Sequence, residues 1–289
     1  MTVTFQDMGL SQPVSDAIRD LGYINPTPIQ QQAIPVLLKG TKDFVGLAQT
    51  GTGKTAAFGL PLLSLIDTSI KQVQGLVICP TRELCMQIAK DFEDYGKYMT
   101  DFHSVAVYGG SSIENQIKQI KRGAQIVVAT PGRLIDLIER RALKLDAVTH
   151  VVLDEADEML NMGFREDIEN ILSHATSRQA AWLFSATMPK EVRRITETFM
   201  QNPAEVKVTS EITAKNIKHV YYQCQSSQKY ETLKRLIDFN PGMYGIIFTR
   251  TKLEAQDIAE KLLKEGYEID ALHGDLSQQQ RDKVMGRFR

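Results

Sequence analysis

Residues 43–55 read DFVGLAQTGTGKT, in which an apolar run is followed by a loop containing two glycines and then by Lys54-Thr55. An apolar helical pattern continues after Thr55. A short strand, a glycine-rich loop and a helix in this order form the context in which backbone N–H groups surround phosphate. We therefore predict a phosphate-binding loop at 48–55 in preference to an ordinary tight turn, although the general pattern begins with Gly where this chain has Ala48.

Each group of this loop has a predicted role. Backbone N–H groups at the helix start would surround the phosphates, and the lysine ammonium would pair with the β and γ phosphates of ATP. The threonine hydroxyl after the lysine would ligate Mg²⁺. The predicted ligands are therefore ATP and Mg²⁺, and the residues predicted to bind them here are Thr50, Gly51, Thr52, Gly53, Lys54 and Thr55.

Short apolar runs recur along the chain after this first one and alternate with helical patterns. Runs that are apolar almost throughout suit parallel strands that are covered on both faces. We predict an α/β fold with a doubly wound parallel sheet and right-handed crossovers. The predicted strands lie at 43–48, 75–79, 104–108, 125–129, 149–153, 180–184 and 205–208, and helical patterns between them at 84–99, 113–122 and 133–140.

Composition narrows the class of protein. The chain has 289 residues, of which 43% are apolar and 24% charged, so it is long enough for one large domain and part of a second. The formal net charge of −1 excludes a broadly basic coat for nucleic acid but allows a local basic groove. Three scattered cysteines suggest neither a disulfide framework nor a zinc site, and no apolar stretch is long enough to span a membrane. We expect a cytoplasmic protein.

The run at 149–153 ends in four residues, Asp154-Glu155-Ala156-Asp157. The carboxyl ends of strands are where ligands of open α/β sheets bind. Asp154 would hold Mg²⁺ through water, and Glu155 would orient and deprotonate an attacking water. An acidic cluster at a helix start is more often only a cap, but the phosphate loop upstream favours the catalytic reading. The predicted catalytic residues are Lys54, Asp154 and Glu155.

The combination of GTGKT at 51–55 and DEAD at 154–157 resembles the DEAD-box ATP-dependent RNA helicases, and the compact amino terminus is similar to bacterial members. The resemblance implies RecA-like domains. GYINPTPIQ at 22–30 is similar to the family's Q motif, with Phe5 at the matching distance upstream. By resemblance, Gln30 would bond the adenine edge, which its amide donor and acceptor suit, and Tyr23 and Phe5 would help to form the adenine pocket.

Further strand ends carry motifs that resemble the family's RNA-contacting segments. Hydroxyls, glycine amides and guanidiniums are suitable donors to phosphate, and none of them reads a base. Each segment alone would be read as a cap or a turn, but together they predict a surface. The family usually has Ala where this chain has Cys85, and we expect no functional change there. The residues predicted to bind RNA are Pro80, Thr81, Arg82, Gly109, Gly110, Thr130, Pro131, Gly132 and Arg133 and, with weaker signals, Thr249 and Arg281.

Ser185-Ala186-Thr187 ends the strand at 180–184. By resemblance, Ser185 and Thr187 would bond the DEAD segment, including Asp157, and link the nucleotide site to the RNA site. A serine and a threonine at a strand end would otherwise be ordinary satisfied polar groups. The predicted coupling residues are Ser185, Thr187 and Asp157.

A polar segment without apolar periodicity follows the seventh run and predicts an interdomain linker. The predicted organisation is a first, ATP-binding RecA-like domain at 1–208, a linker at 209–217 and a second RecA-like domain at 218–289. We expect this second domain to be incomplete, because a helical run reaches residue 289 without a stop signal. Its predicted strands are 219–224, 244–248 and 268–272, and its predicted helices are 229–239, 252–265 and 278–289.

The sequence thus predicts an RNA-dependent ATPase that couples ATP binding and hydrolysis to RNA binding and to local unwinding or remodelling of ribonucleoprotein. The resemblance implies a monomer that contacts single-stranded or short duplex RNA through its backbone. We expect weak hydrolysis by the chain as given, because the family's last motifs, including an arginine finger, would lie beyond residue 289. The alternatives are a nonhydrolytic RNA clamp, a DNA translocase and, least favoured, a small-molecule kinase.

Overall fold

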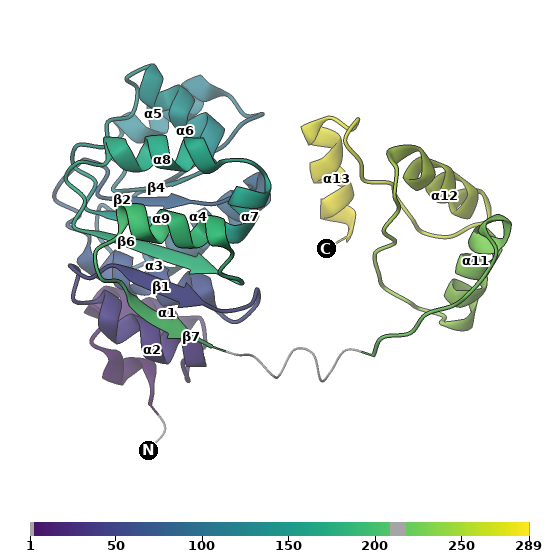
Figure 1. The fold of residues 1–289 in the computed structure, drawn as a ribbon, viewed down its shortest axis with the longest axis horizontal. Helices are drawn as coiled ribbons and strands as arrows, with labels where there is room; N and C mark the ends of the chain where they lie inside the picture. The colour runs from purple at the N-terminus through teal and green to yellow at the C-terminus, as the bar shows by residue number, and fades with distance from the viewer. Residues whose placement is uncertain (1–2, 209–217, 289) are drawn as a thin grey trace. The chain divides into compact units, whose positions relative to one another are not determined.

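The computed structural model describes residues 3–208 and 218–288 (Figure 1). The chain divides into two compact units, Met1–Thr213 and Ala214–Arg289. The predicted linker at 209–217 lies outside the described residues.

The first unit is built on a seven-stranded sheet in which every paired strand runs parallel to its neighbours. The order across the sheet is β3-β4-β2-β5-β6-β1-β7. All seven predicted strands are therefore confirmed, and so is the parallel arrangement. The strands are β1 (Phe44–Leu47), β2 (Gly75–Ile78), β3 (Ser104–Val107), β4 (Ile126–Ala129), β5 (His150–Leu153), β6 (Ala180–Ser185) and β7 (Ala204–Lys207).

Helices cover both faces of this sheet (Figure 1). Successive strand residues point to opposite faces, so Val152 packs in one core while Val151 and Leu153 pack in the other. The short 3₁₀ helix η1 (Phe5–Met8) and helices α1 (Gln12–Asp20), α2 (Pro28–Leu37), α3 (Lys54–Leu65) and α4 (Arg82–Tyr95) line the first core. The second core is lined by α5 (Ile113–Lys121), α6 (Pro131–Glu139), α7 (Ala156–Asn161), α8 (Arg165–His174) and α9 (Lys190–Phe199).

The doubly wound architecture follows from the strand composition. Trp182 and Phe184 of β6 are fully buried on one face, and Leu183 is fully buried on the other. A strand that is apolar on both faces can be stable only between two helical layers. The predicted helices at 84–99, 113–122 and 133–140 are confirmed as α4, α5 and α6, with ends that differ by a few residues.

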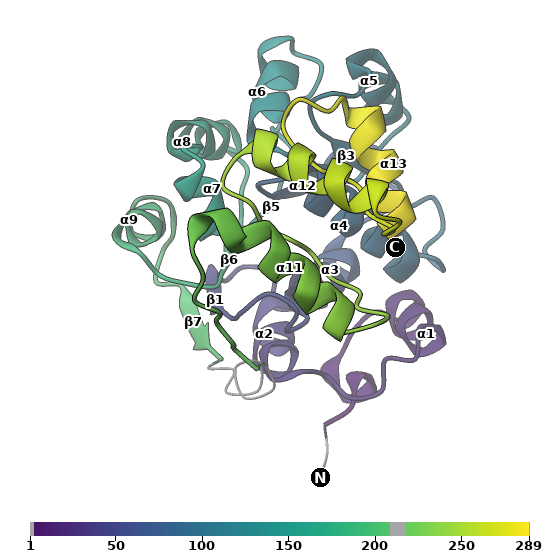
Figure 2. The same cartoon turned by 90° about the vertical axis from the view of Figure 1, so that its right-hand side faces the viewer.

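The second unit contains the predicted helices but not the predicted strands (Figures 1 and 2). The segments at 219–224, 244–248 and 268–272 are irregular chain, so the strand prediction for these described residues was wrong. A strand needs a neighbour to pair its backbone N–H and C=O groups, and an apolar sequence does not supply one. The elements of this unit are η2 (Ser226–Gln228), α11 (Lys229–Phe239), α12 (Lys252–Lys264) and α13 (Gln278–Phe288).

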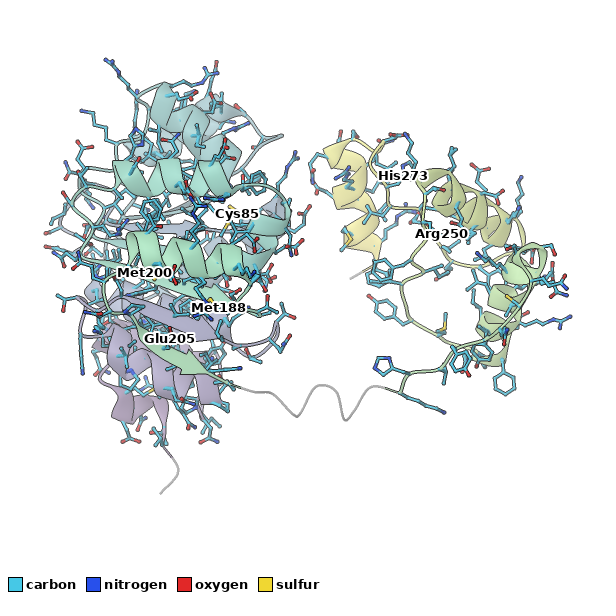
Figure 3. All side chains as sticks on the ribbon, in the orientation of Figure 1. Cys85, Met188, Met200, Glu205, Arg250 and His273 are labelled. Atoms are coloured by element: carbon cyan, nitrogen blue, oxygen red, sulfur yellow. The ribbon has the colours of Figure 1, made fainter. Side chains whose placement is uncertain are left out.

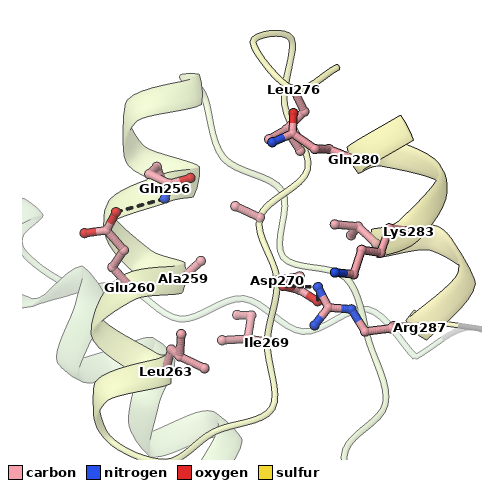
Figure 4. A pocket seen from close by; sticks show the side chains of 12 residues that line it. Gln256, Ala259, Glu260, Leu263, Ile269, Asp270, Leu276, Gln280, Lys283 and Arg287 are labelled. Carbon is pink, nitrogen blue, oxygen red and sulfur yellow. Dashed lines mark hydrogen bonds and ion pairs between the residues drawn. The ribbon is translucent and has the colours of Figure 1, made fainter. Parts of the chain in front are cut away.

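Packing in the second unit is correspondingly loose. Tyr244 and Phe248 are 71% and 91% exposed, whereas Ala259 and Leu262 of α12 are buried. Between α12 and α13 lies a cavity of about 330 Å³, lined in part by Leu263 and Ile269 (Figure 4). None of the predicted ligand-binding residues lines it.

No helix within residues 3–208 and 218–288 combines the length and the apolar character needed to cross a bilayer.

Candidate functional site

Apart from Phe5 and the segment at 22–30, which precede β1, the motif segments of the first unit follow the carboxyl ends of parallel strands, so they lie along one edge of the sheet. The sheet order divides them into two groups. The loops after β5, β6 and β1 carry the phosphate loop and the acidic and Ser-Ala-Thr segments. The loops after β3, β4 and β2 carry the segments predicted to bind RNA. Since β2 and β5 are paired neighbours, the two groups adjoin along one edge.

The phosphate loop joins β1 directly to α3, as predicted. Thr52 Oγ1 donates to the carbonyl of Gln49 over 2.7 Å, which closes the loop on itself. Gly51 and Gly53 have φ values of 76° and 88°, a region in which a side chain is strained. Gly53 is the N-cap of α3, so the first N–H groups of this helix open toward the loop.

Lys54 is the first residue of α3 and is only 6% exposed. Among the described residues, its Nζ has no hydrogen-bond partner. A buried ammonium without a partner is costly unless a negative ligand satisfies it. The loop amides and this ammonium therefore fit a polyphosphate.

Gln30 joins the N-terminal segment to the phosphate loop. Its Oε1 accepts from the N–H of Thr27 over 2.8 Å, and its Nε2 donates to the carbonyl of Gly53 over 3.0 Å. A Cβ on Gly53 would displace the Gln30 amide from its bond to the Gly53 carbonyl, so the glycine allows this close approach. Because each amide atom retains a second lone pair or hydrogen by valence, these bonds leave capacity for the edge of a base.

Three aromatic residues meet beside this segment. Phe5 and Tyr23 have ring centroids 5.9 Å apart, and Tyr23 and Tyr95 have centroids 6.1 Å apart in an edge-to-face arrangement. The hydroxyls of Tyr23 and Tyr95 lie 3.3 Å apart. Phe5 and Tyr95 are buried, whereas Tyr23 is 38% exposed. Tyr23 is therefore the member that can offer its ring to a ligand.

Asp154 lies at the end of β5 and is 2% exposed. Burial, assisted by the neighbouring carboxylate of Glu155, raises the pKa of Asp154 to about 6, against the opposing effect of the Lys54 ammonium. One carboxylate oxygen accepts from the N–H of Glu155 over 3.0 Å. A buried carboxylate beside a buried ammonium suits a cation and its phosphate ligand, because a bound cation stabilises the ionised form.

Glu155 has φ 52° and ψ 49°, a left-handed conformation that is unfavourable for a residue with a Cβ. It is the N-cap of α7, between the buried Asp154 and the helix. Strained residues of this kind persist where the surroundings fix them and cluster at functional sites. This left-handed conformation turns the chain sharply at Glu155, the residue predicted to activate water.

Asp157 connects the ends of β5 and β6. Its Oδ2 accepts from the N–H of Thr187 over 2.9 Å and from the Thr187 hydroxyl over 2.6 Å, while its own N–H donates to Ser185 Oγ over 3.3 Å. Partial burial would raise the pKa of Asp157, but the hydrogen bonds from Thr187 and Ser185 outweigh it and hold the pKa below its usual value. The structure therefore brings together the three residues predicted to couple the sites.

The second group of loops forms around Arg82 and a glycine pair. Thr81 is the N-cap of α4 and accepts from the N–H of Leu84 over 3.3 Å. A Cβ on Gly110, which has φ 82°, would collide with the guanidinium of Arg82, so the side chain of Arg82 lies against this glycine. Cys85 is fully buried within the first unit (Figure 3), and its thiol donates to the carbonyl of Val128 over 3.1 Å.

Arg133 lies in the first turn of α6, where Thr130 is the N-cap and Pro131 the first residue. Its Nη1 donates to the carbonyl of Ser111 over 3.1 Å and to Oε1 of Gln116 over 2.9 Å. The structure thus joins the loop after β4 to the loop after β3. Of the glycines predicted to bind RNA, Gly109 lies in the loop after β3, and Gly132 lies in the first turn of α6 beside Arg133.

The remaining predicted residues, Thr249 and Arg281, belong to the second unit. Thr249 Oγ1 donates to the carbonyl of Thr251 over 3.0 Å, and Arg281 Nη2 donates to the carbonyl of Gly274 over 3.1 Å. These are local bonds, and they give neither residue a defined ligand.

Two residues at the site did not appear among the sequence predictions. Gln116 occupies a position within the apolar stripe formed by Ile113, Ile117 and Ile120 of α5, and this polar interruption was a signal that could have identified it. Tyr95 continues the buried stripe of α4 and looks like any core aromatic residue. Only its contact with Tyr23 distinguishes it.

Comparisons with known proteins agree with this geometry. Residues 27–195 match the family model described as DEAD/DEAH box helicase, and residues 228–289 match the helicase conserved C-terminal domain. The chain is 46% identical to the DEAD-box ATP-dependent RNA helicase CshA of Bacillus subtilis over 290 residues, covering all of this chain and 58% of the relative. It is also 46% identical to CshA of Bacillus cereus over 287 residues, covering 99% of this chain and 54% of the relative. The chain therefore spans about half the length of these relatives.

Two solved structures of other proteins also match this chain over nearly all of its length. Dbp5 of S. cerevisiae bound to RNA and ADP BeF3 matches with a TM-score of 0.87 and 31% identity, over 99% of this chain and 73% of the yeast chain. A DEAD box protein from the hyperthermophile Methanococcus jannaschii matches with a TM-score of 0.68 and 39% identity, over 99% and 77% of the two chains.

Proposed function

This chain belongs to the DEAD/DEAH box helicase family, and from that membership we propose that it is an RNA-dependent ATPase which uses ATP binding and hydrolysis to bind RNA and to unwind short duplexes or remodel ribonucleoprotein. The observation that carries the proposal is the arrangement of the sheet edge. The segments that would hold ATP follow β1, β6 and β5, and the phosphate-donor segments follow β2, β4 and β3. The two groups adjoin at the paired strands β5 and β2.

We propose that Lys54 and the amides of 50–53 bind the β and γ phosphates of ATP. Thr55 and Asp154 would hold Mg²⁺, which supplies charge neutralisation at the phosphates when bound. Within residues 3–208 and 218–288, no three His, Cys, Asp or Glu side chains cluster as a metal site. Mg²⁺ takes few protein ligands and relies on phosphates and water.

Glu155 is the proposed general base. A carboxylate that orients and deprotonates water must be held within hydrogen-bond reach of the reacting phosphate. The left-handed conformation of Glu155 supports this role, since strained residues cluster at functional sites.

The base of the nucleotide would lie at Gln30, Tyr23 and Phe5. Gln30 retains donor and acceptor capacity for one edge of adenine, and the half-exposed ring of Tyr23 offers a stacking surface. Buried Phe5 would support Tyr23 from behind. An amide that presents both a donor and an acceptor favours a base edge with the complementary pair.

RNA would bind through its backbone at the loops after β2, β3 and β4, namely through Pro80, Thr81, Arg82, Gly109, Gly110, Thr130, Pro131, Gly132 and Arg133. Thr249 and Arg281 of the second unit would contribute further contacts. Because these groups suit phosphate and not base edges, we expect weak sequence specificity and an affinity that falls with salt. Asp157, Ser185 and Thr187 would couple the two sites.

The experiment that tests this function is steady-state ATP turnover without nucleic acid, with single-stranded RNA and with DNA of matched sequence and length. Stimulation by RNA that is absent in Glu155→Gln supports the proposal, and Lys54→Ala should lose ATP binding. Equal stimulation by DNA would favour a DNA translocase instead.

A nonhydrolytic RNA clamp is the alternative, in which ATP only keeps the protein closed on RNA. Glu155 argues against it, because a clamp has no need of a strained carboxylate at this position. RNA retention that persists in wild type with no phosphate release would favour the clamp.

We also propose a cytoplasmic location, which the three free cysteines support.

A further inference from the structure

Gln116 of α5 is a polar side chain in an apolar setting, with 3% of its surface exposed. Its carboxamide has a partner at each end. Nε2 donates to the carbonyl of Tyr108 over 3.0 Å, and Oε1 accepts from Nη1 of Arg133 over 2.9 Å. An aliphatic residue would fill the same stripe without the cost of desolvating an amide, so packing alone does not account for Gln here.

Within the described part of the chain, the hydrogen bonds of the Arg133 side chain are made through one nitrogen, Nη1. Nη1 carries two hydrogens, and one is directed to Gln116 and the other to the carbonyl of Ser111 over 3.1 Å. The guanidinium is planar, and its five N–H groups form a rigid fork. Fixing Nη1 by two bonds therefore fixes the direction of the other edge, which is formed by Nε and Nη2.

The partners of Gln116 and Arg133 flank the glycine pair. Tyr108 precedes Gly109, and Ser111 follows Gly110. The Gln116 carboxamide binds the carbonyl of Tyr108 at the start of this loop. Arg133 Nη1, which also donates to Gln116, binds the carbonyl of Ser111 at the end of the loop. Arg82 lies against Gly110 within the same loop, so two guanidiniums flank one short backbone segment.

We propose that Gln116 is a positioning residue for RNA binding: it holds Arg133 by Nη1 so that the edge formed by Nε and Nη2 receives one RNA phosphate in a bidentate manner. This inference rests on the proposed function, because it assumes that the loops after β3 and β4 bind RNA. Gln116 itself does not touch RNA. Gln116 contributes by orienting the Arg133 guanidinium, whose charge is present with or without Gln116.

The test measures the affinity of the full chain for a fluorescein-labelled single-stranded oligouridine, with a nonhydrolysable ATP analogue, across a series of salt concentrations. The variants are Gln116→Met, Arg133→Ala and the double variant. Gln119→Met is the matched control, because Gln119 is an exposed glutamine of the same helix. Affinity for a fluorescent ADP and the unfolding transition of Trp182 show whether the nucleotide site and the fold are intact.

We expect Arg133→Ala to weaken RNA binding about tenfold and to lower the salt slope by about 0.7. Gln116→Met should weaken binding about three- to tenfold, with little change of slope because the charge remains. The double variant should bind no more weakly than Arg133→Ala alone, since the glutamine acts through the arginine. Gln119→Met should bind RNA as wild type does, and the affinity for ADP should be unchanged in all variants.

The outcomes that overturn the inference can be told apart. If Arg133→Ala binds RNA like wild type, the proposed RNA surface is wrong at this loop, and the role of Gln116 fails with it. If Arg133→Ala weakens binding but Gln116→Met does not, or if the two effects add, the RNA surface stands and the positioning role is refuted. If Gln116→Met fails to fold, Arg133→Lys decides: lysine keeps the charge but lacks the fork, so wild-type affinity in that variant would refute bidentate presentation.

Discussion

Oδ2 of Asp157 accepts both the hydroxyl and the backbone N–H of Thr187, over 2.6 and 2.9 Å. Asp157 lies in the first turn of α7, which follows β5, and Thr187 lies in the loop after β6, so these bonds join the segment that carries Asp154 and Glu155 to the next strand end. Hydrogen bonds to a charged group are worth roughly 1.5–3 kcal/mol when both partners are present. A displacement of the segment around Asp157 is therefore resisted by the segment around Thr187, as a coupling role requires.

Replacing Thr187 by Val should uncouple RNA binding from hydrolysis. The hydroxyl bond is lost while the backbone N–H bond and the shape of the side chain remain. We expect RNA stimulation of ATP turnover to fall at least about fivefold, the lower end of typical coupling energies, with ATP affinity unchanged in the absence of RNA. Steady-state turnover with and without RNA measures the effect.

Thr198→Val is the control for this experiment, because Thr198 is an exposed threonine whose hydroxyl donates to a carbonyl within α9. Equal loss of stimulation in both variants would argue against a specific role for the bond to Asp157.

Replacing Glu155 by Gly should stabilise the protein while it abolishes turnover. Glu155 has φ 52°, a conformation that costs a residue with a Cβ about 1–2 kcal/mol. The flexibility of Gly in the unfolded chain offsets part of this, so we expect a net gain of about 0.5–1 kcal/mol in the free energy of unfolding. Urea unfolding followed by Trp182, the single tryptophan of the chain, measures it.

Glu155→Gln serves as the comparison, since it removes the charge and the base but keeps the strained backbone. Both variants should be inactive, and only the glycine variant should gain stability from the backbone. A glycine variant that is less stable than the glutamine variant would show that the left-handed turn carries no strain.

Replacing Asp91 by Asn should stabilise the protein at neutral pH but not in acid. Desolvation, with repulsion from Asp94, raises the pKa of Asp91 from 3.8 to about 6. The folded state therefore binds the proton more tightly, so the cost of the charged form is absent below about pH 3.8 and complete above about pH 6. After allowing for solvent screening of a half-buried carboxylate, we expect a gain on the order of 1 kcal/mol at pH 7.

Unfolding midpoints measured in urea at pH 4 and at pH 7 give this difference. Glu93→Gln, an exposed change on the same helix, should show no comparable dependence on pH. An Asn variant whose gain in stability is the same at both pH values would exclude titration of Asp91 as its cause.

Replacing Tyr95 by Phe should weaken the recognition of the base but not of the phosphates. The hydroxyls of Tyr23 and Tyr95 lie 3.3 Å apart, and burial raises the pKa of Tyr95, so its hydroxyl stays protonated. Loss of this hydrogen bond, worth about 1 kcal/mol, should lower ATP affinity about fivefold. Inorganic tripolyphosphate, which has no base, should bind as it does to wild type.

Tyr98→Phe is the matched control, because Tyr98 lies just beyond the end of α4 and its hydroxyl donates to Asp20 on the surface. If the Tyr95 and Tyr98 variants lose ATP affinity equally, Tyr95 has no special role at the base.

The sequence alone determined the architecture of the first unit and the chemistry of its loops. Apolar runs bounded by polar segments specified the central strands, because a strand buried on both faces must be apolar at successive positions, whereas burial alternates along the edge strands β3 and β7. The strand ends that carry GTGKT, DEAD and Ser-Ala-Thr were readable because each motif is contiguous in the chain. In a parallel sheet, contiguous motifs after successive strands reach the same edge whatever the details of packing.

Tertiary structure alone decided how the side chains work together. The contact of Tyr23 with Tyr95 joins residues 72 positions apart, and the bond from Arg133 to Gln116 joins two helices, so no local pattern contains either pair. The left-handed turn at Glu155 likewise depends on its surroundings. The same principle explains the error in the second unit: apolar segments at 219–224, 244–248 and 268–272 have strand character, but a strand forms only where a neighbour satisfies its backbone. Sequence specifies what each segment can form, and the pairing of distant groups decides what it does form.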